Sequence, residues 1–232
     1  MLRATVGHGA AGGARRAAGD GGAVTFGSFN IGIKITPEVL RLWRRVLDAV
    51  PGSRLVVKSN TFAQPEALEL FRERAVAAGL DASRLEVRGR TASMEAHLEA
   101  YGAIDVALDT FPYHGTTTTC EAMLMGVPVV TLTRDTHAGR VGASLLTAAG
   151  AGESRGAAWS PADWVARDAE EYVAIAAQLA GNLRQLESIR AGLRERLLSS
   201  PLCDGRVFAA QFQDAVREAW SGTAAKEAVG GR

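Results

Sequence analysis

Cysteine is scarce in this sequence, which has Cys120 and Cys203 and no others among its 232 residues. Two cysteines so far apart cannot form a disulfide framework or a zinc site, and such low usage is typical of the cytoplasm. An excess of one charge is also missing, because 26 basic residues are balanced by 25 acidic ones. A formal net charge of +1 gives no overall field that favours nucleic acid or a membrane surface as partner.

Long apolar runs are absent as well. Arg, Asp and Glu interrupt every stretch before it reaches the roughly 18 apolar residues of a membrane helix. Residues 1–23 are rich in Gly, Ala and Arg and lack the apolar core of a signal peptide. We expect them to be a flexible lead-in and residues 221–232 to be a flexible tail, so that the ordered domain covers residues 24–220.

Between these ends, short β-like segments alternate with longer helical patterns, which is typical of βαβ units around a parallel sheet. Strands are expected at residues 24–29, 54–58, 85–87, 104–108 and 128–132. Helices are expected at about 36–50, 65–78, 93–101, 116–125, 139–149, 168–180, 183–198 and 205–220, the last with an apolar stripe. The predicted fold class is α/β, with a Rossmann-like, doubly wound parallel sheet capped by C-terminal helices.

The strongest signal for a binding site is the run Gly115-Thr116-Thr117-Thr118-Thr119. It follows an expected strand and opens an expected helix, so backbone N–H groups and hydroxyls can meet an anion at the positive end of the helix dipole. This arrangement favours a pyrophosphate. The alternative is that one threonine caps the helix and the rest are surface residues, although capping accounts for one threonine and not for four beside a glycine.

Two charged residues are candidates to act beside this run. Lys34 follows the first expected strand and is one of three lysines among 26 basic residues. It can stabilise the charge of a diphosphate leaving group, or it can be a solvated surface lysine. Glu121 lies early in the helix, where it can accept hydrogen bonds from ribose hydroxyls or can be an ordinary acid favoured by the helix dipole.

The remaining candidates are single residues. His97 lies on a short expected helix, where an imidazole can stack on a base, bond to a phosphate or simply be packed. His114 and His137 have spacings unlike those of a metal site, so we expect no metal. Cys120 is expected to be packed, although a position near a helix start can also make a thiol reactive. Asp109 is expected to brace the loop backbone and not to act as a base.

Five blocks, in order and at consistent spacing, carry a family resemblance. They are Val24-Thr25-Phe26-Gly27-Ser28-Phe29-Asn30 with Lys34, the block from Leu108 to Glu121, Gly126-Val127-Pro128, Arg140-Val141-Gly142-Ala143-Ser144 and Ser200-Pro201-Leu202. Over about residues 24–220 the chain resembles the C-terminal half of O-linked N-acetylglucosamine transferases of the SPINDLY type, including their bacterial tetratricopeptide-repeat relatives. The resemblance implies an inverting, metal-independent GT-B glycosyltransferase, of which this chain is the donor-binding lobe.

The resemblance also implies roles for single residues. Lys34 matches the lysine on the diphosphate and is the expected catalytic residue. The expected donor-binding residues are Asn30 beside that lysine, Ala92 and Met94 at the edge of the base, His97 packed on uracil, Thr116, Thr117 and Thr118 after Gly115 in the phosphate-binding turn, and Glu121 on the ribose. The implied donor is a UDP-sugar, with UDP-N-acetylglucosamine expected, and no cofactor is implied.

These expectations describe the UDP-sugar-binding lobe of a protein O-glycosyltransferase that modifies Ser or Thr. The family contacts its protein acceptor through an N-terminal lobe and tetratricopeptide repeats, which this sequence lacks, and its segment Ile31-Gly32-Ile33 is more apolar than expected for the family. One alternative is therefore a truncated, non-catalytic nucleotide-binding or interaction module. Another is a fragment that begins at a misplaced start codon. An exposed apolar face would indicate a lost partner.

Overall fold

The computed structural model describes residues 23–150 and 158–230, which leaves the expected lead-in, except for its last residue, outside the described part. Parallel strands form a sheet in the order β3-β2-β1-β4-β5-β6. The strands are β1 (Thr25–Ser28), β2 (Arg54–Lys58), β3 (Leu85–Arg88), β4 (Val106–Leu108), β5 (Val129–Leu132) and β6 (Val165–Ala166). This order is the doubly wound order of Rossmann folds, so the predicted fold class is confirmed.

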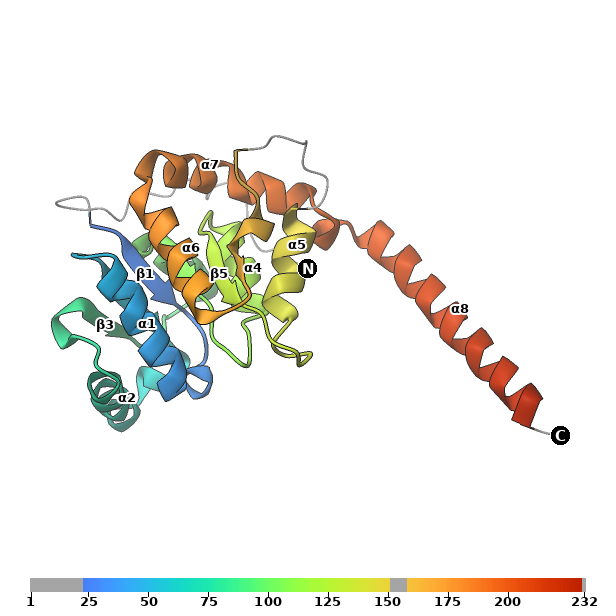
Figure 1. Ribbon diagram of the computed structural model, residues 1–232, viewed down its shortest axis with the longest axis horizontal. Helices are drawn as coiled ribbons and strands as arrows, with labels where there is room; N and C mark the ends of the chain where they lie inside the picture. Colours follow the sequence, from blue (N-terminus) through green and yellow to red (C-terminus); the bar gives the residue numbers. More distant parts are fainter. Residues whose placement is uncertain (1–22, 151–157, 231–232) are drawn as a thin grey trace.

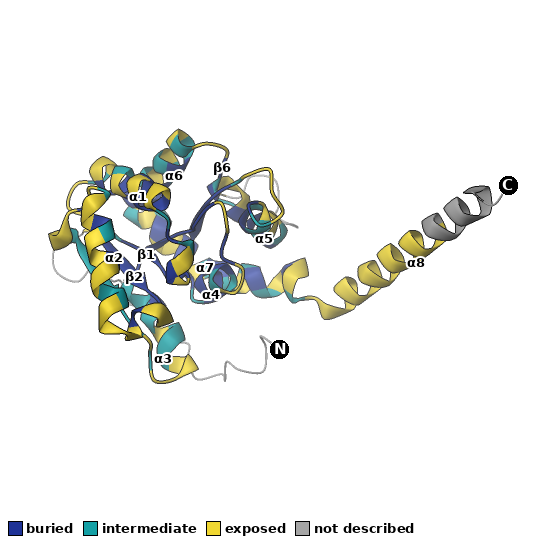
Figure 2. Cartoon of the chain, turned by 90° about the horizontal axis from the view of Figure 1, so that it is seen from below, coloured by how far each residue is buried: buried dark blue, intermediate teal, exposed yellow. Residues whose placement is uncertain are grey.

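Helices cover both faces of the sheet (Figures 1 and 2). They are α1 (Pro37–Ala49), α2 (Pro65–Ala77), α3 (Met94–Glu99), α4 (Thr117–Leu124), α5 (Val141–Gly150), α6 (Ala169–Gly181), α7 (Leu183–Ser199) and α8 (Gly205–Gly230). Helix α1 contacts α2 and α6, whereas α4 contacts α5 and α7. Because parallel crossovers are right-handed and the strand order reverses after β3, the two groups lie on opposite faces. Among the described helices, none is long and apolar enough to cross a membrane.

Local sequence explains where the helices begin and end. At the start of α1 the Thr36 hydroxyl accepts a hydrogen bond from the Val39 N–H, and Pro37 takes the first helical position, where its missing N–H costs nothing. The buried face of α1 is apolar and includes Trp43, which is fully buried. After α2 the chain turns at Gly79 with a φ of +90°, a conformation that favours glycine.

The centre of the sheet is the pairing of β1 with β4, where the strand order reverses. Gly27 pairs with Ala107 there, and a Cβ on Gly27 would lie 2.4 Å from Ile104 Cγ2, so no larger residue fits without a shift. In open parallel sheets, ligands bind beyond the carboxyl ends of the strands at such a reversal. The loops after β1 and β4 therefore lie side by side at the position where a site is expected.

One strand, β6, was not expected, because the sequence analysis predicted five. It has two residues and follows a 3-10 turn at Pro161–Trp164. So short a strand cannot show an alternating pattern, and its place at the sheet edge depends on pairing with β5, where Val165 lies opposite Thr131. Residues 151–157 of the irregular segment before it lie outside the described residues.

Helix α8 projects away from the rest of the molecule (Figure 1). Its expected apolar stripe is present but exposed: the exposed fractions are 41% for Val207, 65% for Phe208, 60% for Phe212, 52% for Val216 and 78% for Trp220. The helix continues past Trp220 to Gly230, so the expected boundary between domain and tail does not coincide with a helix end. Figure 2 shows this surface as exposed along its described length.

Candidate active site

A cleft of about 600 Å³ opens at the carboxyl edge of the sheet. Its walls come from the loop after β1, the end of β2, the segment that leads from β3 into α3, and the start of α4. Six of the predicted donor-binding residues line it, namely Ala92, Met94, His97, Thr117, Thr118 and Glu121. The structure thus brings together residues that are widely separated in the sequence.

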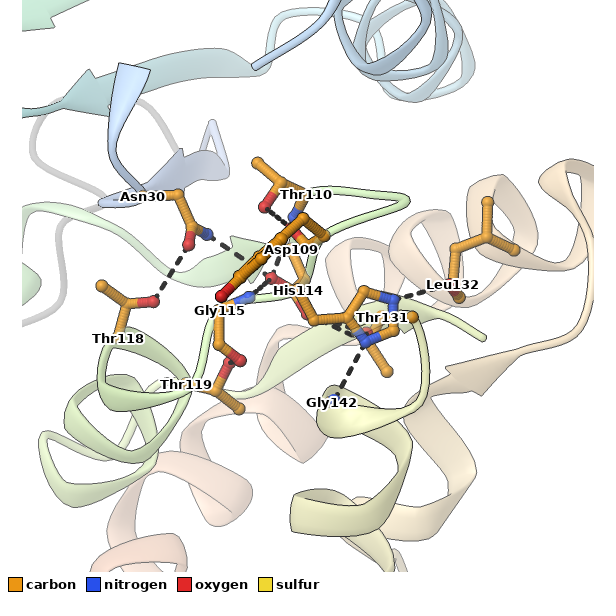
Figure 3. A network of polar contacts seen from close by, with 12 residues as sticks. Asn30, Asp109, Thr110, His114, Gly115, Thr118, Thr119, Thr131, Leu132 and Gly142 are labelled. Atoms are coloured by element: carbon orange, nitrogen blue, oxygen red, sulfur yellow. Dashed lines mark hydrogen bonds and ion pairs between the residues drawn. The ribbon is translucent and has the colours of Figure 1, made fainter. Parts of the chain in front are cut away.

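Asp109, at the end of β4, organises the loop that follows (Figure 3). One carboxylate oxygen accepts hydrogen bonds from the N–H groups of Thr110 at 2.9 Å and Gly115 at 2.8 Å. The other accepts from the Thr131 hydroxyl at 2.8 Å. Burial raises the pKa of Asp109, although these hydrogen bonds and the nearby His114 oppose the shift. Asp109 therefore braces the loop, as expected, and does not face the cleft.

Gly115 and Asn30 join this loop to the end of β1. The Thr118 hydroxyl donates to Asn30 Oδ1 at 3.2 Å, and Asn30 Nδ2 contacts Asp109 Oδ1 at 3.4 Å. A Cβ on Gly115 would lie 2.4 Å from Thr118 Oγ1 and 2.9 Å from Asn30 Oδ1, so only glycine fits this turn unchanged. The amide of Asn30 is buried and bonded within the protein, and its contact with a donor stays a prediction.

The threonine run opens α4 without capping it. Thr116 occupies the N-cap position, but its side chain makes no capping hydrogen bond. Thr119 is buried and its hydroxyl donates to the Gly115 carbonyl at 3.0 Å, whereas Thr116 and Thr117 are exposed. The simple capping alternative is therefore wrong, and exposed hydroxyls lie at the positive end of the helix dipole.

Lys34 reaches this turn from the other loop. It ends a short 3-10 turn after β1, and its Nζ donates to the His114 carbonyl at 2.8 Å, one residue before Gly115. The same Nζ lies 4.0 Å from the centre of the Tyr113 ring. Burial lowers the pKa of Lys34, and Asp109 opposes that shift. The lysine and the threonine turn thus meet, although Lys34 is not among the residues that line the cleft.

Glu121 lies in the second turn of α4 and is nearly buried, which excludes the alternative of an ordinary surface acid. Its Oε2 lies 3.0 Å from His97 Nε2 and accepts a hydrogen bond from the Tyr101 hydroxyl at 3.1 Å. Burial and this carboxylate raise the pKa of Tyr101 well above its ordinary value. The rings of Phe29 and His97 lie 5.9 Å apart between centroids, so an aromatic wall adjoins the carboxylate.

Lys58 is a cleft residue that the sequence analysis missed. It ends β2, is almost fully buried, and its Nζ lies 2.8 Å from His97 Nδ1 and 5.6 Å from the centre of the Phe29 ring. The signal was available, because Lys58 is another of the three lysines and ends an apolar strand. Arg90 also lines the cleft and was missed.

His114 and Cys120, the other single candidates, are described by the groups around them. The buried His114 accepts from the Gly142 N–H at its Nδ1, 2.9 Å away, and its Nε2 lies 2.8 Å from the Leu132 carbonyl. Burial raises the pKa of Cys120 to about 11, with smaller contributions from Cys203 and Glu121, so its surroundings disfavour the reactive thiolate form. Within the described residues, no three or more His, Cys, Asp or Glu side chains are grouped to hold a metal.

Known proteins are similar to this chain in sequence. The SPINDLY protein of Hordeum vulgare, named a probable UDP-N-acetylglucosamine--peptide N-acetylglucosaminyltransferase, is 43% identical over 199 residues, which are 86% of this chain and 20% of that protein. The UDP-N-acetylglucosamine--peptide N-acetylglucosaminyltransferase of Caenorhabditis elegans is 32% identical over 198 residues, which are 85% of this chain and 16% of that protein. The chain therefore spans about a fifth or less of the length of these relatives.

Solved structures share the fold. A mutant of the O-GlcNAc transferase of Thermobaculum terrenum is similar with a TM-score of 0.73 and 37% identity, over 86% of this chain and 36% of that chain. Sucrose-phosphate synthase of Thermosynechococcus elongatus, at 13% identity and a TM-score of 0.55 over 86% of this chain and 46% of that one, is similar in fold alone. These neighbours are GT-B glycosyltransferases, and the family model for glycosyl transferase family 41 matches residues 15–212. The chain therefore belongs to glycosyl transferase family 41.

Proposed function

We propose that this chain is the UDP-sugar-binding lobe of an inverting protein O-glycosyltransferase that transfers N-acetylglucosamine to Ser or Thr. The observation that carries the proposal is the meeting of two loops at the reversal of strand order, where Lys34 bonds to the residue before Gly115. Membership of family 41 supports the same reading. So do the names of the relatives, which are peptide N-acetylglucosaminyltransferases.

The cleft suits a nucleotide in size and lining. A volume of about 600 Å³ is typical of small-molecule sites. In the proposed complex the base lies against His97 near Ala92 and Met94, a ribose hydroxyl donates to Glu121, and the diphosphate lies at the threonine turn. Each group then meets the chemistry that recognises it: an aromatic ring, a carboxylate acceptor and a helix N-terminus.

The proposed reaction is a single displacement at the anomeric carbon. The acceptor hydroxyl attacks from the face opposite the diphosphate, the bond from carbon to phosphate oxygen breaks, and UDP leaves with the electron pair. The hydroxyl proton goes to a base that the family resemblance assigns to the other lobe. Lys34 and the N–H groups of the turn stabilise the negative charge that grows on the leaving diphosphate.

The proposed partners are the nucleotide-sugar donor and a protein acceptor. The acceptor would be held by the N-terminal lobe and tetratricopeptide repeats of the complete enzyme. The proposed place of action is the cytoplasm, which is consistent with two free cysteines and no disulfide between described residues. A second candidate function is a non-catalytic nucleotide-binding module, because the base of the proposed reaction is not assigned to this lobe.

A kinetic comparison tests the proposal. In a complete family 41 enzyme that carries this lobe, Lys34→Ala is expected to lower kcat about 100-fold or more and to change donor affinity less than tenfold, because the charge that Lys34 stabilises develops mainly in the transition state. Unchanged turnover would contradict this role. Sugar transfer by the present chain alone would reject the non-catalytic alternative.

A further inference from the structure

Lys58, His97 and Glu121 form one line of contacts that the proposed reaction does not explain. Lys58 Nζ lies 2.8 Å from His97 Nδ1, and His97 Nε2 lies 3.0 Å from Glu121 Oε2. All three residues line the cleft, and they come from β2, α3 and α4. The imidazole thus lies between an ammonium group and a carboxylate, with one ring nitrogen facing each.

The chemistry of these partners determines where the imidazole proton lies. An ammonium group has donors and no acceptor, so a ring nitrogen that bonds to it must offer a lone pair. An ionised carboxylate accepts only, so the nitrogen that bonds to it must carry a proton. Together they select the neutral imidazole with its proton on Nε2. An imidazolium would place an N–H against the Lys58 ammonium, with two positive charges within hydrogen-bond distance.

The same contacts orient Glu121. Both His97 and Tyr101 bond to its Oε2, and no hydrogen bond among the described residues goes to Oε1. The carboxylate is therefore held by one oxygen and has the other available as an acceptor. A carboxylate fixed in this way is preorganised for a ligand hydroxyl and loses less conformational freedom on binding.

We propose that Lys58 is a positioning residue of the nucleoside site: it holds His97 as the neutral Nε2–H imidazole, and through His97 it keeps Glu121 Oε1 ready to accept from the ligand's ribose. This inference rests on the proposed function, because it takes the ligand to be a uridine nucleotide. Lys58 acts through the other two residues and does not itself grip the diphosphate. An experiment must therefore separate positioning through His97 and Glu121 from direct contact with the diphosphate.

Charged and titratable groups surround the His97 ring. The Lys58 ammonium comes from β2, the Glu121 carboxylate from α4 and the Tyr101 hydroxyl from the turn at Ala100–Ala103, and Arg88 lies opposite Lys58 on β3. Of these groups, Lys58 is the one that bonds to Nδ1. Its removal leaves the Nδ1 lone pair without a donor, and the Nδ1 chemical shift reports that change.

Nitrogen-15 NMR of the histidine side chains in the full 232-residue chain tests the inference without a ligand. In the wild type, the His97 ring is expected to carry its proton on Nε2 and a lone pair on Nδ1. In Lys58→Met, Nδ1 loses its hydrogen-bond donor, so the Nδ1 chemical shift is expected to differ from that of the wild type. A proton on Nδ1 in the wild type, or an Nδ1 chemical shift that is the same in Lys58→Met and in the wild type, would overturn the proposal.

His114 serves as an internal reference for folding in the same spectra. Its Nδ1 accepts a backbone N–H from Gly142, so it must also be the neutral Nε2–H form, for a reason unrelated to Lys58. Its signals should not change in Lys58→Met. If they do, the variant is perturbed, and Lys58→Arg replaces it, because a guanidinium also donates to Nδ1 and is expected to preserve the wild-type Nδ1 chemical shift.

Binding of uridine and of UDP separates positioning from a phosphate contact. Lys58→Met is expected to weaken both ligands by the same factor, about tenfold, because the altered groups face the nucleoside. The matched control is Lys34→Met, which changes another lysine, in the loop after β1, and is expected to weaken UDP and leave uridine unchanged. Loss of UDP affinity alone in Lys58→Met, or loss of neither, would overturn the proposal. If the wild type binds neither ligand, the proposed function fails while the NMR result still decides the role of Lys58.

Discussion

At the scale of single residues, Gly115 determines the shape of the turn on which the proposed site depends. Gly115→Ala places a methyl group 2.4 Å from Thr118 Oγ1 and 2.9 Å from Asn30 Oδ1, so the turn must move. We expect a loss of about 1–3 kcal/mol in the free energy of unfolding and a loss of UDP binding. Urea unfolding and calorimetry measure the two effects.

The matched control is Gly102→Ala, because a Cβ at Gly102 meets nothing within 4 Å. This variant should keep both stability and binding close to those of the wild type. A Gly115→Ala protein with wild-type stability and wild-type UDP affinity would show that the close contacts of this turn do not constrain it.

Asp109 gives a pH-dependent prediction. Burial raises its folded pKa above the ordinary value, so the folded state binds its proton more tightly than the unfolded state does. The contribution of Asp109 to stability is therefore greatest below its ordinary pKa and falls as pH rises through the raised folded value. Relative to Asp109→Asn, which does not titrate, the wild type should gain stability as pH falls from 7 to 4.

The measurement is urea unfolding of both proteins across this pH range. A difference in stability between them that is constant with pH would contradict the raised pKa. Asp109→Ala should cost more than Asp109→Asn at pH 7, by about 1–3 kcal/mol, because it also leaves the N–H groups of Thr110 and Gly115 without their acceptor.

Sequence reasoning found the residues whose chemistry is unusual for their place, such as Lys34 and the threonine run. It missed Lys58, since an apolar strand that ends in lysine also fits a lysine that extends into solvent. The hydrogen bonds of Glu121 with His97 and Tyr101 could not be predicted either, because they depend on how α4 packs against α3 and the turn after α3. The sequence thus indicated which residue types follow the strands, but it did not indicate which side chains they contact.

At the scale of elements, α8 is the helix that contributes least to the body. It packs mainly against the turn at Pro201–Cys203, and its apolar side chains from Val207 to Trp220 are exposed. Removal of residues 205–232 should therefore change the thermal unfolding midpoint by no more than about 2 °C. By contrast, Leu193→Ala in α7, where the leucine is fully buried, should cost about 2–5 kcal/mol.

Differential scanning calorimetry of the shortened chain and of Leu193→Ala tests this comparison. A large fall in the midpoint of the shortened chain would show that α8 is part of the cooperative unit.

The apolar stripe on α8 shows that a 3.6-residue pattern predicts a helix and an apolar face without showing what that face contacts. The two-residue β6 was missed for the opposite reason, because it is too short to carry a pattern.

At the scale of the whole molecule, the alternation of strands and helices was sufficient to predict a doubly wound sheet. The order β3-β2-β1-β4-β5-β6 then explains why residues from the loops after β1 and β4 meet, although Lys34 and His114 are 80 positions apart. Alternation indicates that crossovers exist, but the neighbours of each strand are set by packing. The cleft lies at this edge because the strand order places the loops after β1 and β4 side by side.

The proposed function requires this edge of the sheet to bind uridine diphosphate, with Lys34 and the threonine turn on the diphosphate. Calorimetric titration of UDP into the 232-residue chain and into its Lys34→Met variant measures this binding, with GDP as the comparison ligand. We predict one site for UDP, at least about tenfold weaker binding of GDP, and weaker binding of UDP in Lys34→Met. No binding of UDP, equal or tighter binding of GDP, or an unchanged UDP affinity in Lys34→Met would contradict the claim.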